Sequence, residues 1–139
     1  MISGISHITF IVKDLERSAS FFQNVFNAEE IYSSGENTFS LSREKFFLIN
    51  NIWLCIMEGE PFTERTYNHI AFQICENDID EYKYIARIKN IGAEIKPERS
   101  RVDGEGRSIY FYDFDNHLFE LHTGMLSERL ASYTKHNPA

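Results

Sequence analysis

The chain contains an internal repeat, and this repeat limits the possible folds more than any other feature of the sequence. SHITFIV near the N-terminus and NHIAFQI from residue 68 share one alternating rhythm, and aligning His7 with His69 also aligns Ile8 with Ile70. Two copies of one structural unit can pack around a shared cleft. The alternative explanation is chance similarity between two halves that each combine a helix with strands.

Each copy has the pattern expected for one strand, one helix and three further strands. In the first copy, alternating side chains predict a strand in SHITFIVKD, residues 6–14, and three- and four-residue spacing predicts a helix over 15–27. Asp14 is suited to cap the start of that helix. Three strands are expected to follow, over residues 30–33, 38–42 (reaching into 46–49) and 52–58.

The second copy repeats this order after a linker at residues 59–67. A strand at 68–74 precedes a helix over 79–90, which ends in an isoleucine-glycine pair typical of a helix C-terminus. That helix is expected to place four side chains on one face: Ile79, Tyr82, Ile85 and Ile88. The later strands are expected over 94–96, 108–113 and 118–123, followed by a short helix in LSERLASY.

These elements predict one α+β domain over residues 1–139, built from tandem βαβββ repeats. Repeat one spans about residues 4–58, repeat two spans about residues 67–124, and a short helix and tail occupy residues 125–139. A chain of 139 residues, 42% of them hydrophobic, is large enough to bury a core.

Composition and charge argue against several classes of protein. The formal net charge of −7 disfavours a nucleic-acid partner, which would need a basic patch. No apolar run approaches the roughly 20 residues needed to cross a bilayer, and the N-terminus lacks the features of a signal peptide. Because Cys55 and Cys75 are too few for a disulfide framework, we expect reduced thiols and a cytoplasmic protein.

Two histidines and one glutamate are candidates to bind a divalent metal ion. His7 and His69 occupy the same position in the first strand of each repeat, so pseudo-twofold symmetry would turn both imidazoles toward one cleft. Glu120 lies in the middle of the otherwise apolar strand HLFELHTG, where an unpaired carboxylate would be costly and a cation would pair it. His122 shares the face of Glu120 and is a competing ligand.

The position in repeat one that matches Glu120 is Cys55, in the segment IWLCIME. Two imidazoles and one carboxylate leave coordination positions open, as a catalytic metal requires. A Cys55 thiolate would close the site and favour zinc, whereas without it the ligand set suits manganese, ferrous iron or zinc. The residues alone do not rank these metals.

In combination, these features resemble the vicinal oxygen chelate superfamily and, within it, the fosfomycin-resistance proteins. The shared stretches, in order, are SHITFIV, WLCI, YNHIAF, EGRSIYFYDFDNHLFELHTG and SERL, and they cover residues 1 to about 133. The resemblance implies a glyoxalase-like cleft and a homodimer whose repeats pair across both chains. One metal can then take ligands from two subunits.

The resemblance is greatest to the hydrolase branch of this family, which inactivates the antibiotic by adding water to its epoxide. It implies Mn(II) bound by His7, His69 and Glu120. It also implies that Glu44, in LSREKFFLI, is the catalytic base. Without the resemblance, Glu44 would be interpreted as a solvated hairpin residue beside Arg43 and Lys45.

The resemblance also implies which residues contact the substrate, a small anionic phosphonate epoxide. Hydroxyl groups and guanidinium groups would bind the phosphonate, and two aromatic side chains would line the pocket; these residues are Thr9, Tyr67, Arg101, Ser108, Tyr110, Arg129, Phe46 and Trp53. Glutathione-using members carry a lysine and a potassium-binding loop where this chain has Ser100. Arg101 beside it can substitute for that cation.

Four other functions remain possible on sequence grounds. A thiol transferase of the same family would open the same epoxide with glutathione or bacillithiol. An extradiol dioxygenase would need ferrous iron and a further acid–base residue, for which His122 is the evident donor. A glyoxalase-type enzyme usually has a second carboxylate at the position of Cys55, and a drug-sequestering protein of this fold would need no metal.

Overall fold

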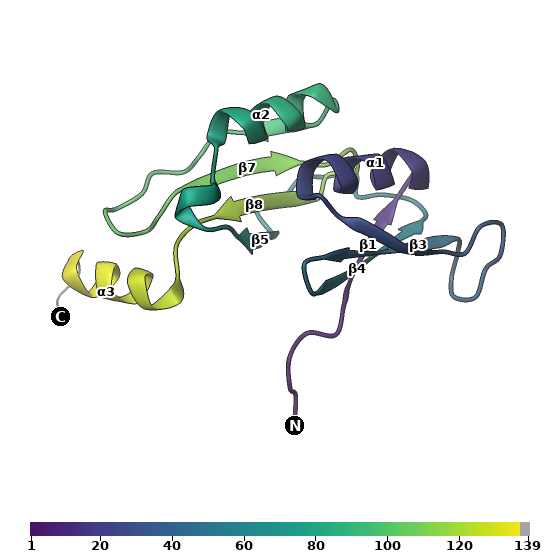
Figure 1. The fold of residues 1–139 in the computed structure, drawn as a ribbon, viewed down its shortest axis with the longest axis horizontal. Helices are drawn as coiled ribbons and strands as arrows, with labels where there is room; N and C mark the ends of the chain where they lie inside the picture. Colours follow the sequence, from purple (N-terminus) through teal and green to yellow (C-terminus); the bar gives the residue numbers. More distant parts are fainter. Residues whose placement is uncertain (137–139) are drawn as a thin grey trace. The chain divides into compact units, whose positions relative to one another are not determined.

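The structure is a computed structural model that describes residues 1–136, and it divides into two compact units. The first unit holds residues 1–65 and 113–117, and the second holds residues 66–112 and the described residues from 118 onward. Each unit contains a four-stranded sheet with a helix on one face (Figure 1). The expected tail reaches residues 137–139, which lie outside the described residues, and the predicted domain limits stay a prediction.

The first unit contains one helix and four strands, in the sheet order β1-β4-β3-β2. Helix α1 begins after Asp14, whose Oδ1 accepts a hydrogen bond from the Arg17 backbone N–H at 3.1 Å, and it ends at Asn27 in the left-handed conformation. Strand β1 runs parallel to β4, while β3 is antiparallel to both β4 and β2. The elements are β1 (Ile8–Val12), α1 (Leu15–Phe26), β2 (Glu29–Ser33), β3 (Glu44–Ile49) and β4 (Ile52–Glu58).

The second unit repeats this topology, with the sheet order β5-β8-β7-β6. Its elements are β5 (His69–Gln73), the 3-10 helix η1 (Glu76–Asp78), α2 (Glu81–Asn90), β6 (Glu94–Lys96), β7 (Ser108–Tyr112), β8 (Leu118–His122) and α3 (Leu126–His136). Asp80 caps α2 as Asp14 caps α1. The predicted βαβββ order is therefore confirmed in both copies.

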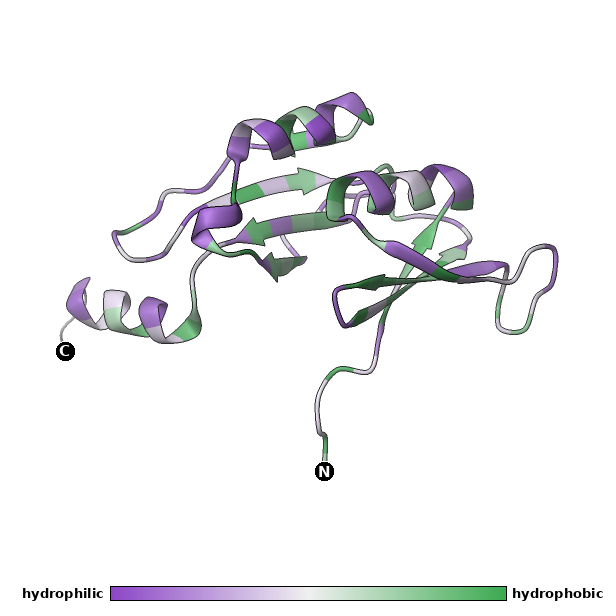
Figure 2. Cartoon of the chain, in the orientation of Figure 1, coloured by the Kyte–Doolittle hydropathy of each residue, from purple (hydrophilic) through white to green (hydrophobic). Residues whose placement is uncertain are grey.

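Each sheet buries one face against its helix and turns the other face away from it. In the first unit, α1 contributes buried phenylalanines that pack on β3 and β4; the fully buried side chains there are Val12, Phe21, Phe22, Phe47, Leu54 and Ile56. The matching layer of the second unit consists of Ile88, Ile109, Phe111, Phe119 and Leu121. Burial of each such side chain contributes about 1.5–3 kcal/mol. In Figure 2, hydrophobic residues lie along β1, whereas β2 is largely hydrophilic and the helices carry residues of both kinds.

Three details differ from the sequence predictions. Residues 38–42 form bends rather than a strand, because β2 ends at Ser33 and β4 ends at Glu58, so that segment has no partner strand. Tyr82 is 90% exposed, because α2 begins at Glu81 and turns this side chain away from the buried Ile88. Helix α3 continues to residue 136, beyond the predicted segment.

The turn between β7 and β8 packs with the first unit. The Asp113 carboxylate accepts hydrogen bonds from the backbone N–H groups of Asp115 and His117, each at 2.9 Å, and this closes the turn. The Asp115 carboxylate accepts from the Lys13 backbone N–H at 3.2 Å. Among residues 1–136, no helix has the length and apolar character required to cross a membrane.

Candidate metal centre and its surroundings

The face of the second sheet that points away from α2 carries four of the predicted site residues. Alternation along β5, β8 and β7, together with the register, places Ala71, Glu120 and Tyr110 side by side across three strands. His69 lies on the same face of β5, and Ser108 on the same face of β7. The strand pairing therefore explains why residues far apart in sequence meet around Glu120.

Glu120 and His69 form a pair that is suited to share a cation. His69 Nδ1 lies 2.7 Å from the backbone carbonyl of Tyr67, so Nδ1 carries the hydrogen, and Nε2 of the neutral ring has a lone pair. That Nε2 lies 3.1 Å from Glu120 Oε1. Two acceptors this close repel each other unless a proton or metal ion lies between them, and the Glu120 side chain is only 5% exposed. A divalent metal fits this donor set.

The other carboxylate oxygen of Glu120 is held by a directed chain of hydrogen bonds. Ser108 Oγ donates to Glu120 Oε2, and His122 Nδ1 lies 2.7 Å from Ser108 Oγ. Arg129 Nη2 lies 3.1 Å from His122 Nε2, which must accept because a guanidinium only donates. Both nitrogens of His122 therefore already have protein partners.

Arg101 brings positive charge to the same carboxylate. Its Nη2 lies 3.4 Å from Glu120 Oε2 and donates to the Tyr110 hydroxyl at 3.0 Å. Its Nη1 atom is buried and has no hydrogen-bond partner within residues 1–136, while its Nε lies 3.4 Å from Glu98 Oε1. Burial raises the pKa of Tyr110 to about 12, so this phenol stays protonated near neutral pH, and the Tyr67 hydroxyl lies 3.3 Å from it. An unsatisfied guanidinium donor beside two phenols can bind an anion.

The loop that carries Arg101 is tied down by a buried glutamate. Glu105 is 2% exposed and accepts from the Arg99 guanidinium at 2.7 Å and from the Val102 backbone N–H at 2.7 Å. Tyr133 of α3 donates a third hydrogen bond to it. Hydrogen bonds from Arg99 and then Tyr133 hold the pKa of Glu105 far below its usual range. The loop therefore supplies the cation, Arg99, that offsets the buried charge of Glu105.

The corresponding face of the first sheet carries aromatic side chains, a thiol and a carboxylate. His7 precedes β1, and its ring centroid lies 4.3 Å from that of Trp53. The rings of Phe46 and Trp53 are 5.2 Å apart in an edge-to-face arrangement. The register places Thr9, Cys55 and Phe46 side by side.

Glu44 is buried, with 7% exposure, which excludes its interpretation as a solvated hairpin residue. It is the first residue of β3. Its backbone N–H donates to Ser34 Oγ at 2.9 Å, and its carbonyl accepts from the Ser34 N–H at 3.0 Å. The Cys55 thiol lies 3.8 Å from Glu44 Oε1. A carboxylate held at this edge has a defined direction and is suited to act as a base.

Two of the three predicted metal ligands, His69 and Glu120, lie together in the second unit. No three side chains of His, Cys, Asp or Glu gather in a metal-binding group among the residues that the structure describes. His69 and Glu120 belong to the second unit, and His7 belongs to the first. The second unit by itself therefore supplies two of the three expected ligands.

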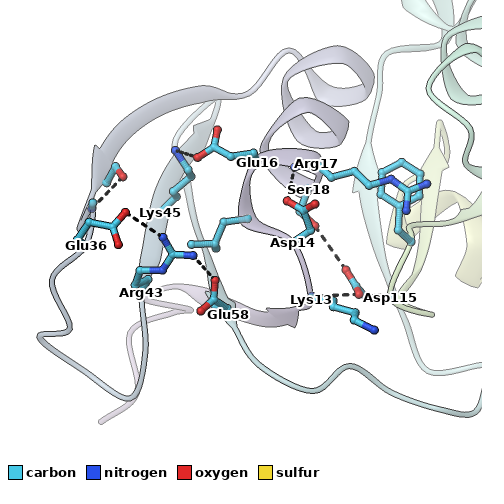
Figure 3. A pocket seen from close by; sticks show the side chains of 14 residues that line it. Lys13, Asp14, Glu16, Arg17, Ser18, Glu36, Arg43, Lys45, Glu58 and Asp115 are labelled. Carbon is cyan, nitrogen blue, oxygen red and sulfur yellow. Dashed lines mark hydrogen bonds and ion pairs between the residues drawn. The ribbon is translucent and has the colours of Figure 1, made fainter.

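A cavity of about 570 Å³ in the first unit is separate from the predicted site residues (Figure 3). Its wall consists mainly of charged residues at the start of α1 and on β3 and β4. Arg43 pairs with Glu36 at 3.4 Å and with Glu58, and Lys45 pairs with Glu16 at 3.2 Å. Because these cations are already neutralised by carboxylates in the same wall, the cavity offers no obvious site for a phosphonate.

Sequence reasoning missed two residues that shape the site. Ser34 holds the backbone of Glu44, although ten residues separate them, and nothing in the pattern of a turn-rich loop indicates that contact. Glu105 lies between two glycines in DGEGRS and would be interpreted as an exposed turn residue. The nearby Arg99 was the one available signal, because a buried carboxylate needs a cation.

Comparison with known proteins identifies the family. The profile of the glyoxalase/bleomycin resistance protein/dioxygenase superfamily matches residues 4–121. The chain is 69% identical to the fosfomycin resistance protein FosX of Listeria innocua over 135 residues, which cover 97% of this chain and 100% of that protein. It is 41% identical to the metallothiol transferase FosB of Shouchella clausii, covering 99% and 92% of the two chains.

A solved structure supports the same assignment. A FosX variant from Listeria monocytogenes, crystallised with Mn(II) and 1S,2S-dihydroxypropylphosphonic acid, superposes with a TM-score of 0.85 at 65% identity, covering 96% of this chain and 99% of that one. The fold and the repeat agree with this likeness. The chain belongs to the glyoxalase/bleomycin resistance protein/dioxygenase superfamily and, within it, to the FosX fosfomycin resistance proteins.

Proposed function

We propose that this protein is a Mn(II)-dependent epoxide hydrolase that converts fosfomycin to an inactive diol. The observation that carries the proposal is Glu44, a buried residue on the aromatic face of the first sheet, whose backbone is held by Ser34 and whose carboxylate faces the Cys55 thiol. The related FosX structure contains a dihydroxypropylphosphonic acid. This compound is what water addition to an epoxypropylphosphonate yields, and it contains no sulfur.

His7, His69 and Glu120 would hold the Mn(II). The facing acceptor atoms of His69 and Glu120, 3.1 Å apart, support this assignment because they need a shared cation. His7 supplies a second imidazole from the matching position of the first repeat. Bound Mn(II) supplies Lewis acidity that stabilises the negative charge developing on the oxirane oxygen as its C–O bond breaks.

Glu44 would act as the general base. Water attacks one oxirane carbon, a new C–O bond forms, and the bond between that carbon and the ring oxygen breaks. Glu44 takes a proton from the attacking water, and the ring oxygen receives a proton to complete the diol. A carboxylate that is already oriented needs no rearrangement at this step.

Hydroxyl and guanidinium groups of both units would bind the phosphonate. Arg101 has a buried Nη1 without a hydrogen-bond partner among the described residues, and Arg129 adds a second positive charge near His122. The remaining contacts would come from Thr9, Tyr67, Ser108 and Tyr110, with Phe46 and Trp53 lining the apolar side of the pocket. The hydroxyl of Ser108 already donates to Glu120, which favours a role in holding that ligand.

We further propose a homodimer in which each metal takes ligands from two copies of the chain. Mixing a His7→Ala variant with a Glu120→Ala variant tests this arrangement. If His7 comes from one copy and Glu120 from the other, heterodimers contain one intact site, and random mixing restores about a quarter of the wild-type activity. If one copy supplies all three ligands, both variants and their mixture remain inactive.

Product analysis tests the proposed reaction. Purified protein with Mn(II) and fosfomycin, without any thiol, should form the diol, and reaction in oxygen-18 water should place one labelled atom in the product. Removal of the metal with a chelator should stop turnover, and added Mn(II) should restore it. A strict requirement for glutathione or bacillithiol would contradict the hydrolase assignment.

Thiol transfer to the same epoxide is the second candidate, favoured by the 41% identity to a metallothiol transferase. Glu44 and the Arg99–Glu105 ion pair both argue against it. A thiolate nucleophile needs no carboxylate base, and the ion pair occupies the loop where glutathione-using members would bind potassium. Product mass with and without thiol separates the two reactions.

A further inference from the structure

The register of the two sheets shows which positions of the two repeats are equivalent. Cys55 in the first repeat corresponds to Glu120 in the second, and Glu44 corresponds to Ser108. Thr9, Cys55 and Phe46 form one row across the first sheet, and Ala71, Glu120 and Tyr110 form the matching row of the second. Two residues before Phe46 along β3 lies Glu44, and two residues before Tyr110 along β7 lies Ser108. Each repeat therefore presents the same diagonal pair of positions on adjacent strands.

Both diagonal pairs contain one carboxylate and one small hydrogen-bond donor. In the first unit the carboxylate lies on β3 and the donor on β4, whereas in the second unit the donor lies on β7 and the carboxylate on β8. In the second unit, the Ser108 hydroxyl on β7 donates to the Glu120 carboxylate on β8. In the first unit, the Cys55 thiol on β4 faces the Glu44 carboxylate on β3, with Sγ 3.8 Å from Oε1. The fold thus orients two functional carboxylates by the same type of contact.

The direction of the Cys55 contact follows from the protonation state of the thiol. Burial, and then the nearby charge of Glu44, raise the pKa of Cys55 to about 11, while hydrogen bonding with Thr9 acts in the opposite sense. At neutral pH the sulfur therefore keeps its hydrogen. A thiol beside a carboxylate must then donate, because the ionised carboxylate only accepts.

We propose that Cys55 is a positioning residue for Glu44 in the hydration reaction. Its thiol donates to Oε1 and fixes the carboxylate rotamer, which leaves the second oxygen to receive the proton from water. Ser34 holds only the backbone of Glu44, so the thiol is the contact that orients the carboxylate itself. This inference rests on the proposed function, because it assigns a role only if Glu44 is the base.

Replacement of Cys55 by residues with and without a donor tests the proposal. Cys55→Ala should lower kcat for diol formation about tenfold, because it removes a weak donor that holds a charged carboxylate in place. The affinity for Mn(II) should change less than about twofold, because Cys55 is not one of the proposed ligands. Cys55→Ser retains a donor and should restore most of the lost kcat.

Two controls separate orientation from packing. Cys55→Val fills the space without a donor, so it should match Cys55→Ala in kcat even where its thermal stability differs. In a Glu44→Gln background, Cys55→Ala should have no further effect on the residual rate. The exposed thiol of Cys75 provides the matched control, and Cys75→Ser should keep the wild-type kcat.

The outcomes distinguish this inference from the proposed function. If wild-type protein with Mn(II) forms no diol, the hydrolase proposal fails. If the wild type forms diol and Cys55→Ala keeps its kcat, the positioning role of Cys55 is wrong. The role is also wrong if Cys55→Ser is as slow as Cys55→Ala, or if the losses from Cys55→Ala and Glu44→Gln multiply in the double variant.

Discussion

The two repeats of this protein share a topology but differ in where they place a carboxylate. In the second unit, Glu120 lies in the middle of the sheet and is surrounded by His69, Arg101 and Ser108. In the first unit the matching position holds Cys55, and the carboxylate has moved to Glu44 at the start of the neighbouring strand. Under the proposed function, the second unit would bind the cation and the first unit would accept the proton.

This difference shows how a duplicated sheet can divide the parts of one reaction. A metal ligand needs a basic neighbour and a cation to offset the cost of burial. A general base needs a fixed direction and no strong cation against it, because a close cation would make it a weaker proton acceptor. The second unit places Arg101 beside its carboxylate, whereas the first unit places only a thiol and backbone contacts there.

Removal of the carboxylate of the second unit should have the largest effect. Glu120→Ala leaves His69 without its partner, so we expect Mn(II) binding to be lost and diol formation to fall roughly a thousandfold or more. Calorimetric titration with Mn(II) and a product assay measure the two effects. The exposed Glu60 supplies the control, and Glu60→Ala should match the wild type. Tight Mn(II) binding by Glu120→Ala would show that Glu120 is not a ligand.

Removal of the carboxylate of the first unit should break the reaction in a different way. Glu44→Gln keeps the shape of the side chain but cannot take a proton, so we expect hydration to fall about 100- to 1000-fold. Mn(II) affinity should stay within about threefold of the wild type, because the ligands are elsewhere. Glu44→Gly, which removes the side chain, should have the same effects on the rate of hydration and on Mn(II) affinity. Equal loss of metal affinity and rate would place Glu44 at the metal instead.

The repeat made much of this site predictable from sequence. His7 and His69 could be matched because strand alternation and helix spacing recur in the same order, and these local patterns decide which face a side chain occupies. Glu120 was visible as a carboxylate in an apolar strand, where burial demands a partner. The same alignment identified Cys55 as its counterpart, and the register of both sheets agrees with that match.

Contacts between distant segments could not be predicted in this way. The hydrogen bonds between Ser34 and the backbone of Glu44 depend on the path of an irregular loop, and the sequence of such a loop has no periodicity that would predict its path. Residues 38–42 contain residues that favour strands, yet they have no neighbouring strand, and hydrogen bonding to a partner decides whether a strand forms. The role of the turn at 113–117 likewise emerges only from its packing against Lys13.

The hydrogen bond that orients the metal ligand should have a smaller effect than either carboxylate. Ser108→Ala removes the donor to Glu120 Oε2, so we expect Mn(II) affinity to fall about tenfold, as is typical for loss of such a supporting contact. At saturating Mn(II), kcat should stay within about threefold of the wild type. If Ser108 instead binds the phosphonate, KM for fosfomycin will rise while Mn(II) affinity is kept. Ser127→Ala, on an exposed surface of α3, serves as control.

The smallest effect on activity should come from the buried glutamate that anchors the Arg101 loop, a feature of the second unit alone. Glu105→Gln weakens its contacts with Arg99 and Tyr133, and because the Arg99 side chain is 34% exposed, the cost in stability should be about 2 kcal/mol. This corresponds to a fall in Tm of roughly 6 °C. We expect kcat within about threefold of the wild type, because Arg101 itself remains.

The dependence of Tm on pH provides the sharper measurement for this variant. The pKa of Glu105 in the folded protein lies far below the value near 4.5 that it has when unfolded, chiefly because Arg99 hydrogen-bonds its carboxylate. Its contribution to stability is therefore complete above that unfolded value and is lost as the pH falls through it toward the folded pKa. The gap in Tm between wild type and Glu105→Gln should be largest near pH 7 and should narrow between about pH 5 and pH 3. A gap that stays constant over that interval would mean that Glu105 contributes through packing and hydrogen bonds that do not depend on its charge. The ion pair between Arg99 and Glu105 in the second unit would then contribute nothing to stability.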